Sequence, residues 1–391
     1  MNRVPKLRFK EFNGEWEEKR LYEIAKKITD KNIENKINIV LTNSAEHGII
    51  KQEDFFDKEI ANEKNINTYY LVEKNSFVYN PRISKFAPFG PINRNHLECG
   101  VVSPLYLVFN INEEYRNFME KYFKTSYWYK YMYNVGNSGV RSDRMNISNN
   151  DFFNMNVFMP NNIQEQEKIA DFLSSVDKKI SITEEKLNLF KDYKKGIMQK
   201  IFNQELRFKD SNGNDYPEWE EKRLGDISSI SAGGDIKKEN FSVNKTEEFK
   251  IPVYANSLEK NGLYGYSNIF KVTGESITVT ARGNIGVAIY RNENYVPIVR
   301  LLVIKMDSTK YSHKYFSYFI NTIKIIQEVT GVPQLTAPQL REYKIIYPSS
   351  LEEQQKIADF LSSIDNKIDN LAAELEDLKE FKKGLLQQMF V

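Results

Sequence analysis

The sequence predicts an α+β fold in which two pseudo-twofold-related α/β domains are joined by two long helices that form an antiparallel coiled coil. Three observations predict it. The stretch "EQEKIADFLSSVDKKI" at 165–180 returns as "EQQKIADFLSSIDNKI" at 353–368. A second pair of similar segments, 7–24 and 206–227, opens each half. The segments between these pairs contain short β-type runs and share no comparable identity.

The chain of 391 residues is a tandem duplication. When 163–202 is laid over 351–390 without gaps, about half of the positions are identical. Two matched pairs in the same order are not a chance similarity, and such a repeat defines the architecture. We therefore predict four segments: a first domain at 1–160, a shared helix at 161–205, a second domain at 206–348 and a second shared helix at 349–391.

Both shared helices carry an apolar seam of the coiled-coil type. Steps that alternate between four and three residues, starting from Ile169 and from Ile357, meet almost only apolar side chains. The exception that both copies share is a lysine at the same place, Lys194 and Lys382. The seam residues that we expect to pair are Ile169, Leu173, Ile180, Leu187, Ile357, Leu361, Ile368 and Leu375.

The apolar seam alone does not decide whether the two helices pair parallel or antiparallel. Forty residues make a rod of about 60 Å, and the nearest matching stripe is the other copy, so we expect the two helices to pair with each other. Pseudo-twofold symmetry favours an antiparallel pair, but the linking domain could also span a parallel one. The simpler alternative is that each helix packs only on its own domain, and the length of the seam argues against it.

Each domain is expected to contain short strands followed by an aromatic-rich helix, at 113–133 and 311–329. A glycine-containing loop and a short strand ending at Pro160 or Pro348 come next. We expect the "EWEEKR" openers to be charged helix surface. The expected strands lie in "INIVLT", "NSFVYN" and "SPLYLVF" of the first domain and in "KIPVYA", "SITVTA", "VAIY" and "VRLLVIKM" of the second.

Composition indicates a folded protein of the reducing cytoplasm. Apolar residues make up 41% of the chain, which is enough for real cores. Lys and Arg outnumber Asp and Glu in 1–160 and 206–348, a mild hint that these domains have anionic partners. The single cysteine, Cys99, allows no internal disulfide. With no apolar leader and no run of membrane-spanning length, we expect a cytoplasmic protein without membrane association.

The sequence offers no catalytic or metal-binding constellation. The three histidines, His47, His96 and His313, lie far apart, and one cysteine supplies no partner for them. There is no P-loop motif. The "YNPR" stretch at 79–82 lacks the second proline and the aromatic residue of an adenine-methyltransferase loop. We therefore expect a binding protein with no catalytic residue, metal or cofactor of its own.

Polar and basic residues in the two domains are candidates for contacts to DNA. The segment 76–96 interleaves basic residues with aromatics and asparagines and contains no acid. Arg, Lys, Asn and Gln are the side chains that pair with base edges in the major groove. Each candidate taken alone could equally be a solvated surface group. The candidates are Arg82, Lys85, Arg94, Arg141 and Arg144 in the first domain, and Arg282, Asn284 and Gln334, with Gln339 nearby, in the second.

Several motifs together resemble the specificity subunit of type I restriction–modification enzymes. They are the doubled helix after a proline-ended strand ("MPNNIQEQ", "YPSSLEEQ"), the two "EWEEKRL" openers and the "PQLTAPQL" lead-in at 333–340. The resemblance covers the whole chain. The corresponding loop of the first domain, "VRSDRMNIS", does not match the "PQLTAPQL" pattern. The DNA contacts of the family are therefore harder to assign to residues of this loop.

The resemblance implies that the variable domains are target recognition domains, each reading one half of a bipartite, asymmetric sequence in double-stranded DNA. The shared helices would space the two domains and dock two methyltransferase subunits. Those subunits would bring S-adenosylmethionine chemistry on adenine, and restriction subunits would bring cleavage that depends on ATP and Mg²⁺. No chemistry of its own is expected of this chain.

Two other readings stay open at the level of sequence. One is a self-contained methyltransferase or nuclease, which methyl transfer by the isolated chain would support. The other is a coiled-coil scaffold for ligands other than DNA, which the absence of salt-dependent DNA binding would support.

Overall fold

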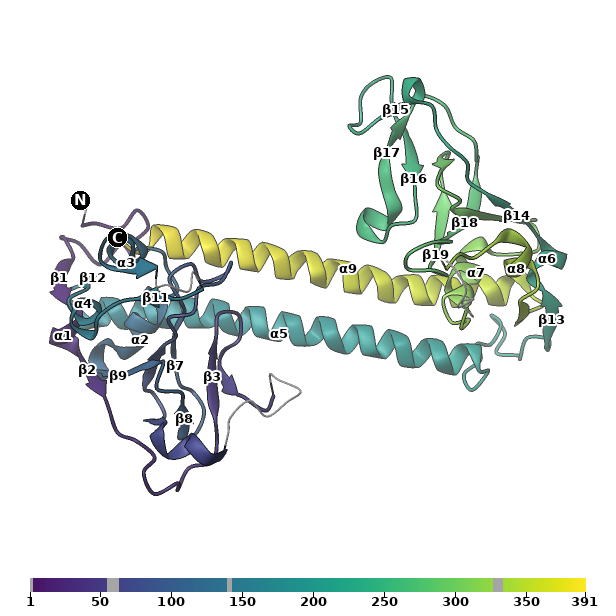
Figure 1. Cartoon of the computed structure of the whole chain (residues 1–391). Coiled ribbons are helices and arrows are strands. Elements are labelled where there is room, and N and C mark those ends of the chain that lie inside the picture. Colours follow the sequence, from purple (N-terminus) through teal and green to yellow (C-terminus); the bar gives the residue numbers. More distant parts are fainter. Residues whose placement is uncertain (1–2, 55–62, 139–142, 326–332) are drawn as a thin grey trace. The chain divides into compact units, whose positions relative to one another are not determined.

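The computed structural model describes residues 3–54, 63–138, 143–325 and 333–391, which form two compact units. Unit 1 comprises Met1–Glu184 together with Ala373–Val391, and unit 2 comprises Glu185–Ala372. The division falls inside the two long helices, so each unit holds one β-rich block and parts of both helices (Figure 1). The segment boundaries predicted from the repeat stay predictions.

Unit 1 is built on a four-stranded antiparallel sheet in the order β2-β9-β6-β7. Phe77 and Phe109 face a helix-covered core, whereas Val78 and Val108 face a second apolar cluster under the small sheets β3-β4 and β5-β8. Because both faces are covered, all of β6 is buried. The elements are β1 (Glu17–Arg20), α1 (Leu21–Ile24), β2 (Ala25–Ile28), β3 (Leu41–Ser44), β4 (Gly48–Lys51), η1 (Glu63–Thr68), β5 (Tyr70–Val72), β6 (Phe77–Tyr79), β7 (Ile92–Arg94), β8 (Gly100–Val102), β9 (Leu107–Ile111), α2 (Glu113–Tyr122), α3 (Tyr129–Val135), β10 (Asn137–Ser138), β11 (Met145–Asn146), α4 (Asn149–Phe153) and β12 (Asn156–Met159).

Unit 2 contains two four-stranded sheets, β14-β21-β18-β19 and β15-β17-β16-β20. Ile277 and Ile304 of the first sheet face the cluster that also contains helix α7, whereas Val303 faces a separate small cluster. The elements are β13 (Trp219–Arg223), α6 (Leu224–Ile227), β14 (Ser228–Ala232), η2 (Lys238–Asn240), β15 (Phe241–Ser242), β16 (Ile251–Tyr254), η3 (Glu259–Gly262), β17 (Leu263–Ser267), β18 (Glu275–Val279), β19 (Ala288–Asn292), β20 (Val296–Pro297), β21 (Leu302–Met306), α7 (His313–Ile320), α8 (Ala337–Arg341) and β22 (Lys344–Pro348).

The prediction of an α+β fold is confirmed, and each expected strand segment contains a strand. Two expectations about helices are wrong. The openers form strands β1 and β13, which pair antiparallel with β12 and β22. The exposure of "EEKR" alternates in β1, whereas all four residues are exposed in β13, so charged side chains suit a two-stranded ribbon as well as a helix surface. The aromatic segment of the first domain is two helices, α2 and α3, since Trp128 turns inward and its indole N–H donates to the Phe123 carbonyl. In the second domain the helix ends at Ile320.

The long helices α5 (Ile163–Phe202) and α9 (Leu351–Gln388) pair antiparallel within each unit. In unit 1, Lys382 Nζ lies 2.6 Å from Asp177 Oδ1, and Lys179 Nζ lies 3.4 Å from Glu374 Oε1. Residue numbers therefore rise along α5 as they fall along α9, which excludes a parallel pair. Among the seam residues, Ile169, Leu173, Leu187, Ile357, Leu361 and Leu375 are buried, and Ile180 and Ile368 are partly buried.

The seam lysines make ion pairs at equivalent places of the repeat. Lys194 Nζ lies 2.5 Å from Asp365 Oδ1 in unit 2, matching Lys382 and Asp177 in unit 1. Burial alone would raise the pKa of the Asp177 carboxyl, but hydrogen bonds from Lys121 and Lys382 outweigh it and lower that pKa. A charge that interrupts an apolar seam is best placed opposite its counter-ion, which ties the register of the two helices to one arrangement.

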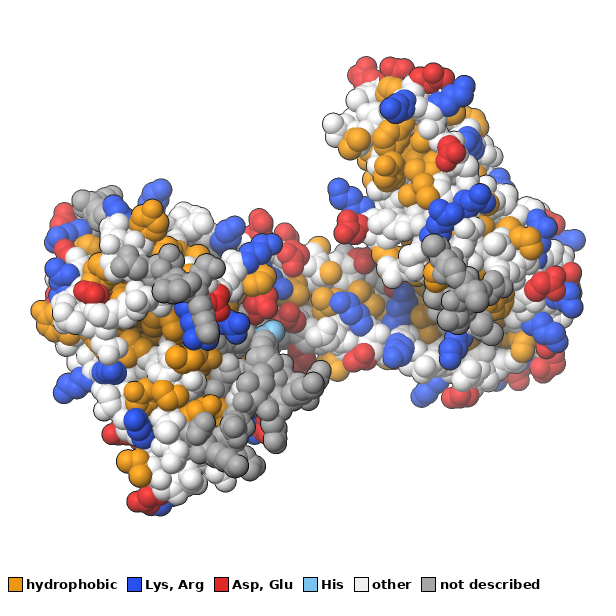
Figure 2. Space-filling model, viewed as in Figure 1, with side chains coloured by type: hydrophobic (Ala, Val, Ile, Leu, Met, Phe, Trp, Pro, Cys, Tyr) orange, Lys and Arg blue, Asp and Glu red, His pale blue; other side chains and the backbone are white. Residues whose placement is uncertain are grey.

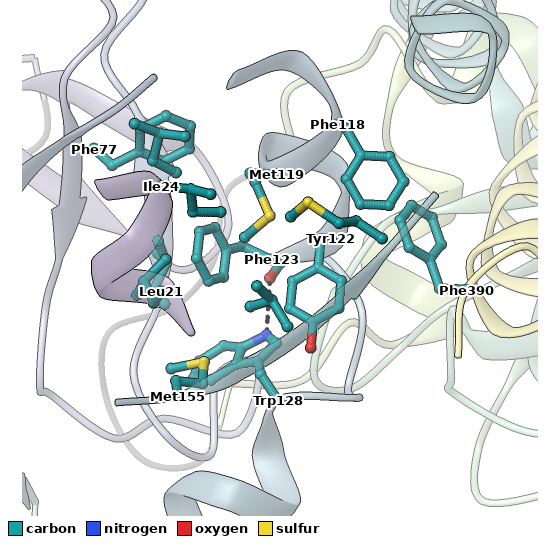
Figure 3. Packing of buried hydrophobic residues seen from close by; sticks show 14 of the residues in the cluster. Leu21, Ile24, Phe77, Phe118, Met119, Tyr122, Phe123, Trp128, Met155 and Phe390 are labelled. Carbon is teal, nitrogen blue, oxygen red and sulfur yellow. Dashed lines mark hydrogen bonds between the residues drawn. The ribbon is translucent and has the colours of Figure 1, made fainter. Parts of the chain in front are cut away.

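Each core is completed by the end of the helix that begins in the other half of the chain. In unit 1, Phe390, just after α9, packs against Phe118 with ring centroids 5.3 Å apart (Figure 3). The ring of Trp16 lies 6.2 Å from that of Phe390. In unit 2, Phe202 at the end of α5 takes the equivalent place against Tyr315 and Phe319. Within each unit, the helix–helix contact and the packing of the helices on the β-rich block thus belong to the same core.

A buried ion pair fixes the opener to the start of the long helix in both units. Arg8 Nε donates to Glu165 Oε1 at 2.7 Å, and Arg207 Nη2 lies 3.1 Å from Glu353 Oε2. Both carboxylates are almost fully buried. Each guanidinium also donates to backbone carbonyls, which compensates the charges inside the fold. Of the helices that the structure describes, none is both long enough and apolar enough to cross a membrane.

Replacing Arg207 by methionine should destabilise unit 2 by about 3–5 kcal/mol, because it leaves the Glu353 carboxylate buried without its counter-ion. Hydrogen exchange followed by mass spectrometry resolves this loss by peptide. We expect lower protection in β13, β22 and the start of α9, with unit 1 unchanged. The exposed Lys209→Met is the matched control. Equal protection in the two variants would contradict the assigned role of the pair.

Candidate nucleic-acid interface

A rigid hairpin loop presents the candidate residues of unit 2. Residues 280–287 connect β18 to β19, and the Thr280 hydroxyl accepts a hydrogen bond from Val287 N at 2.9 Å and donates to the Asn284 carbonyl. Gly283 and Gly286 have φ of +69° and +90°, backbone angles that residues other than glycine rarely adopt. A Cβ on Gly286 would also lie 2.6 Å from Ile325 Cδ1. The loop is therefore held in one shape.

The structure brings Arg282 and Gln334 together. Arg282 Nη2 donates to Gln334 Oε1 at 3.0 Å, and Arg282 Nε lies 3.3 Å from the same oxygen. Leu335 N in turn donates to the Ala281 carbonyl at 2.9 Å, which joins the two loops through the backbone. Asn284 lies exposed at the tip of the hairpin. A half-buried guanidinium held by an amide in this way is preorganised to present its remaining N–H groups to an acceptor.

Gln339 has a structural task instead. Its side-chain oxygen accepts from Thr336 N at 2.8 Å, and the Thr336 side chain accepts from Gln339 N. This is a capping box at the start of α8. The capping box starts α8 directly after the 333–335 segment, which the hydrogen bond from Leu335 N to the Ala281 carbonyl holds beside the hairpin.

In unit 1 the candidates Arg82 and Arg144 also lie side by side. The two residues form an antiparallel bridge, and Ile83 N donates to the Asp143 carbonyl at 2.8 Å. Arg82 is exposed, with its Nε 3.9 Å from Asp143 Oδ2, a loose surface pair that contributes little to stability. Lys85 is exposed on the following turn. Arg141, the remaining candidate of this loop, lies outside the described residues.

Arg94 is engaged inside unit 1. Its guanidinium donates to Asn75 and Asn117 and lies 3.2 Å from Glu120 Oε2, and only 12% of its side chain is exposed. Burial lowers the pKa of Arg94. Burial would raise the pKa of Glu120, but the hydrogen bond from His96 and the nearby cations lower it overall. The geometry gives Arg94 a packing role on β7, and a contact to DNA by Arg94 stays a prediction.

The histidines do not converge on a site. His313 is buried and its Nε2 accepts from Met306 N at 3.0 Å, and burial lowers the pKa of its imidazole. His96 pairs with Glu120 at 2.6 Å on the surface. Within the described ranges there is no group of three or more His, Cys, Asp and Glu residues that could hold a metal ion.

The sequence reasoning missed one set of basic residues. Lysines at matched positions near the ends of both long helices line surface clefts beside the loops just described. Their signal was present in the repeat, as the "KK" before a glycine in both copies. Lysine and arginine side chains occur over both units in Figure 2, interspersed with acidic and hydrophobic ones.

The fold and these loops define a two-module binding protein whose modules differ in their presented side chains. Comparison with protein families identifies the family of the chain. The model of the type I restriction modification DNA specificity domain matches residues 13–191 and again residues 216–380. The chain therefore belongs to this family of type I specificity subunits.

Curated relatives agree with the family. A putative type I specificity subunit of Mycoplasma pneumoniae is 32% identical over 196 residues, covering 50% of this chain and 52% of the relative. The MjaVIII specificity subunit of Methanocaldococcus jannaschii is 26% identical over 261 residues, covering 60% and 61%. The chain thus matches about half the length of the first of these relatives.

Among solved structures, the S subunit of the type I restriction–modification system from M. genitalium shares the fold with a TM-score of 0.65 at 16% identity, over 99% of both chains. A second neighbour, from work on the complex assembly and conformational transition of the type I system, has a TM-score of 0.52 at 13% identity, covering 95% of this chain and 96% of that one.

Arg282→Ala should weaken binding of the chain's target duplex by about 1–3 kcal/mol and relax discrimination at one base pair, because a guanidinium that reads guanine makes two hydrogen bonds to it. Fluorescence anisotropy with a panel of singly substituted duplexes measures both effects. The exposed Lys250→Ala, in the same unit, is the control. An equal loss for every duplex would mark a phosphate contact and contradict base reading.

Proposed function

We propose that this chain reads the DNA target of a type I restriction–modification complex, one half of a bipartite and asymmetric sequence through each unit. The observation that carries the proposal is the double match to the specificity domain, in a chain whose two units hold different sheets and different loops. Unit 1 presents a pair of arginines and unit 2 an arginine held by a glutamine. Different side chains on the two loops favour different base sequences, and hence an asymmetric target.

We further propose that the long helices dock two methyltransferase subunits. The helices are the part of the chain that repeats most closely, so a partner that binds one copy meets an equivalent surface on the other. S-adenosylmethionine would then be bound by the methyltransferase subunits, and ATP and Mg²⁺ by restriction subunits. The absence of a catalytic motif from the sequence supports this division of labour.

Mapping of methylated adenines in cells that express the chain with its methyltransferase partner tests the proposal. We expect a gapped, asymmetric target. Replacing residues 28–140 by the corresponding block of another family member should change one half of that target and leave the other half intact, because the frame around the block is retained. The reciprocal replacement of 230–330 is the matched control and should change the other half. Both halves altered by one replacement, or methyl transfer by the isolated chain, would overturn the proposal.

A fragment ending at Glu205 should dimerise. It lacks Leu385, Met389 and Phe390 of unit 1, but a second copy carries Ile197, Ile201 and Phe202 at the equivalent positions. Two identical recognition units related by twofold symmetry should then read a gapped palindrome. Light scattering at several concentrations measures the dimer, and methylation mapping identifies the target.

The control for this experiment is the same fragment with Phe202→Ala, which removes the ring that would replace Phe390. We expect it to dimerise more weakly, because the pocket between Trp16 and Phe118 stays unfilled. A monomeric fragment in the presence of the methyltransferase, or an asymmetric target, would show that the halves are not interchangeable.

A further inference from the structure

A lysine triplet is retained where the two long helices otherwise diverge. Lys191, Lys194 and Lys195 of α5 correspond to Lys379, Lys382 and Lys383 of α9, although most of the neighbouring positions differ. Positions i, i+3 and i+4 lie on one face of a helix, so each triplet concentrates positive charge. Like charges at this spacing destabilise a helix slightly. The ion pairs to Asp365 and Asp177 account for Lys194 and Lys382 in the fold, but no ion pair in the described residues accounts for Lys191, Lys195 and Lys383.

In unit 1 the triplet of α9 lines one side of a cleft of about 390 Å³. The opposite wall is the turn after α2, which contributes Lys124 and the hydroxyl-bearing Thr125 and Ser126. Tyr127 closes one end, with its hydroxyl donating to the Gln387 carbonyl at 2.7 Å. Of the described residues that line this cleft, none is acidic. The Thr125 hydroxyl already donates to the Tyr122 carbonyl, and Lys124 Nζ donates to Asn93 Oδ1. What the cleft offers an anion is therefore mainly the exposed ammonium of Lys383, with no carboxylate in the lining to compete for it.

Unit 2 has an equivalent cleft, of about 890 Å³, at the other triplet. Its opposite wall is α7 and the residues after it, which contribute Lys314, Asn321 and Thr322. The one acid in its lining, Asp365, is already engaged by Lys194 and by the Tyr318 hydroxyl at 2.6 Å. Two blocks without sequence similarity thus place lysine and hydroxyl groups opposite the same triplet.

Positive charge in these clefts is only partly compensated. The middle lysine of each triplet pairs with an aspartate of the other helix. Lys191, Lys195 and Lys383, by contrast, are exposed and have no ion pair to any residue in the described part of the chain. In unit 1 the pKa of Lys124 is lowered, because its ammonium is partly desolvated and because the ammonium of Lys382 is near. An anion in the cleft would relieve this repulsion.

Each cleft adjoins the loop that carries the candidate base-reading residues. In unit 2 the lining includes Val287 and Ala288, the end of the hairpin loop, and Ala288 N donates to Asn321 Oδ1 at 2.9 Å. In unit 1 the lining residue Tyr129 packs on Phe89, with ring centroids 5.2 Å apart, in the segment that carries Arg82 and Lys85. A duplex that meets either loop would therefore bring its backbone toward the neighbouring triplet.

We propose that the two lysine clefts bind backbone phosphates of the DNA beside each half of the target. The proposal rests on the proposed function and adds a second set of contacts to it. Phosphates are the same in every DNA sequence, so the part of the chain that repeats supplies the contacts to them. The blocks that differ supply the contacts to bases. Phosphate contacts set affinity and position but carry no sequence information.

Anisotropy titrations of the full chain, alone and with its methyltransferase partner, test the proposal on two labelled duplexes, the mapped target and a scrambled sequence. The variants are Lys191→Gln/Lys195→Gln and Lys379→Gln/Lys383→Gln. The control, Lys178→Gln/Lys186→Gln, removes the same charge from exposed positions of α5 outside the clefts. Thermal melting checks that all variants fold equally.

We expect each cleft variant to weaken binding of both duplexes by the same factor. The slope of log K against log salt should fall in magnitude by about 0.9 for each phosphate that the variant no longer neutralises. The control should keep the slope of the original chain. If the original chain shows no salt-dependent binding in either state, the proposed function itself fails.

If the original chain binds and the cleft variants match the control, the phosphate clefts are excluded while DNA reading stands. Weaker binding confined to the mapped target would assign these lysines to base reading and overturn the proposal. Failure to bind the methyltransferase partner, with unchanged DNA binding, would assign the clefts to a protein interface and overturn it as well.

Discussion

The antiparallel pairing of α5 and α9 is the constraint on which both units depend. Its register is marked by the Lys194–Asp365 and Lys382–Asp177 pairs, which join the same two positions of the repeat in opposite order. With the register set, the last residues of each helix reach the block that precedes the other helix. Phe390 and Phe202 then complete cores that neither half of the sequence supplies alone. The core of each unit therefore includes a helix end from the other half of the sequence.

The β-rich parts of the two units differ in sequence and in sheet arrangement, although the paired helices that hold them are similar. Strands β1 and β12 in unit 1, and β13 and β22 in unit 2, tie each block to its helix at both ends of the variable sequence. The buried Arg8–Glu165 and Arg207–Glu353 pairs strengthen the same junctions. The 280–287 hairpin, which carries Arg282, is held in its own shape by hydrogen bonds of Thr280. A frame that holds its shape independently of the loops is what a protein needs if its ligand specificity is to change while its assembly stays constant.

The repeat made much of the fold predictable, because duplicated helices with an apolar seam have few ways to bury it. The strands were also found, since short apolar runs between turn residues are a strong local signal. The openers were mistaken for helix because "EEKR" has no periodicity that separates the two conformations. The break between α2 and α3 was missed because it depends on Trp128 entering the core, a tertiary contact.

The candidate site was less predictable than the fold. Sequence chemistry selected Arg282 and Gln334, which do meet, but it also selected Arg94, whose partners Asn75 and Glu120 come from distant parts of the chain. Residue type alone does not distinguish a guanidinium held inside the protein from one free to meet a ligand. The lysine triplets were overlooked for the opposite reason: a charge run on a helix usually marks only solvated surface, and here the opposite wall of the cleft gives it a partner surface.

The place of Phe390 in the core of unit 1 has a consequence for biosynthesis. Translation proceeds at roughly 5–20 residues per second, so about 10–40 s separate the emergence of Phe202 from that of Phe390. Throughout that interval the first block is on the ribosome with the gap beside Trp16 and Phe118 unfilled. Neighbouring ribosomes on one message then carry nascent chains whose Phe202 is the repeat equivalent of Phe390. If Phe202 can fill that gap, as proposed for the fragment ending at Glu205, the order of synthesis sets a competition between folding within one chain and exchange between two.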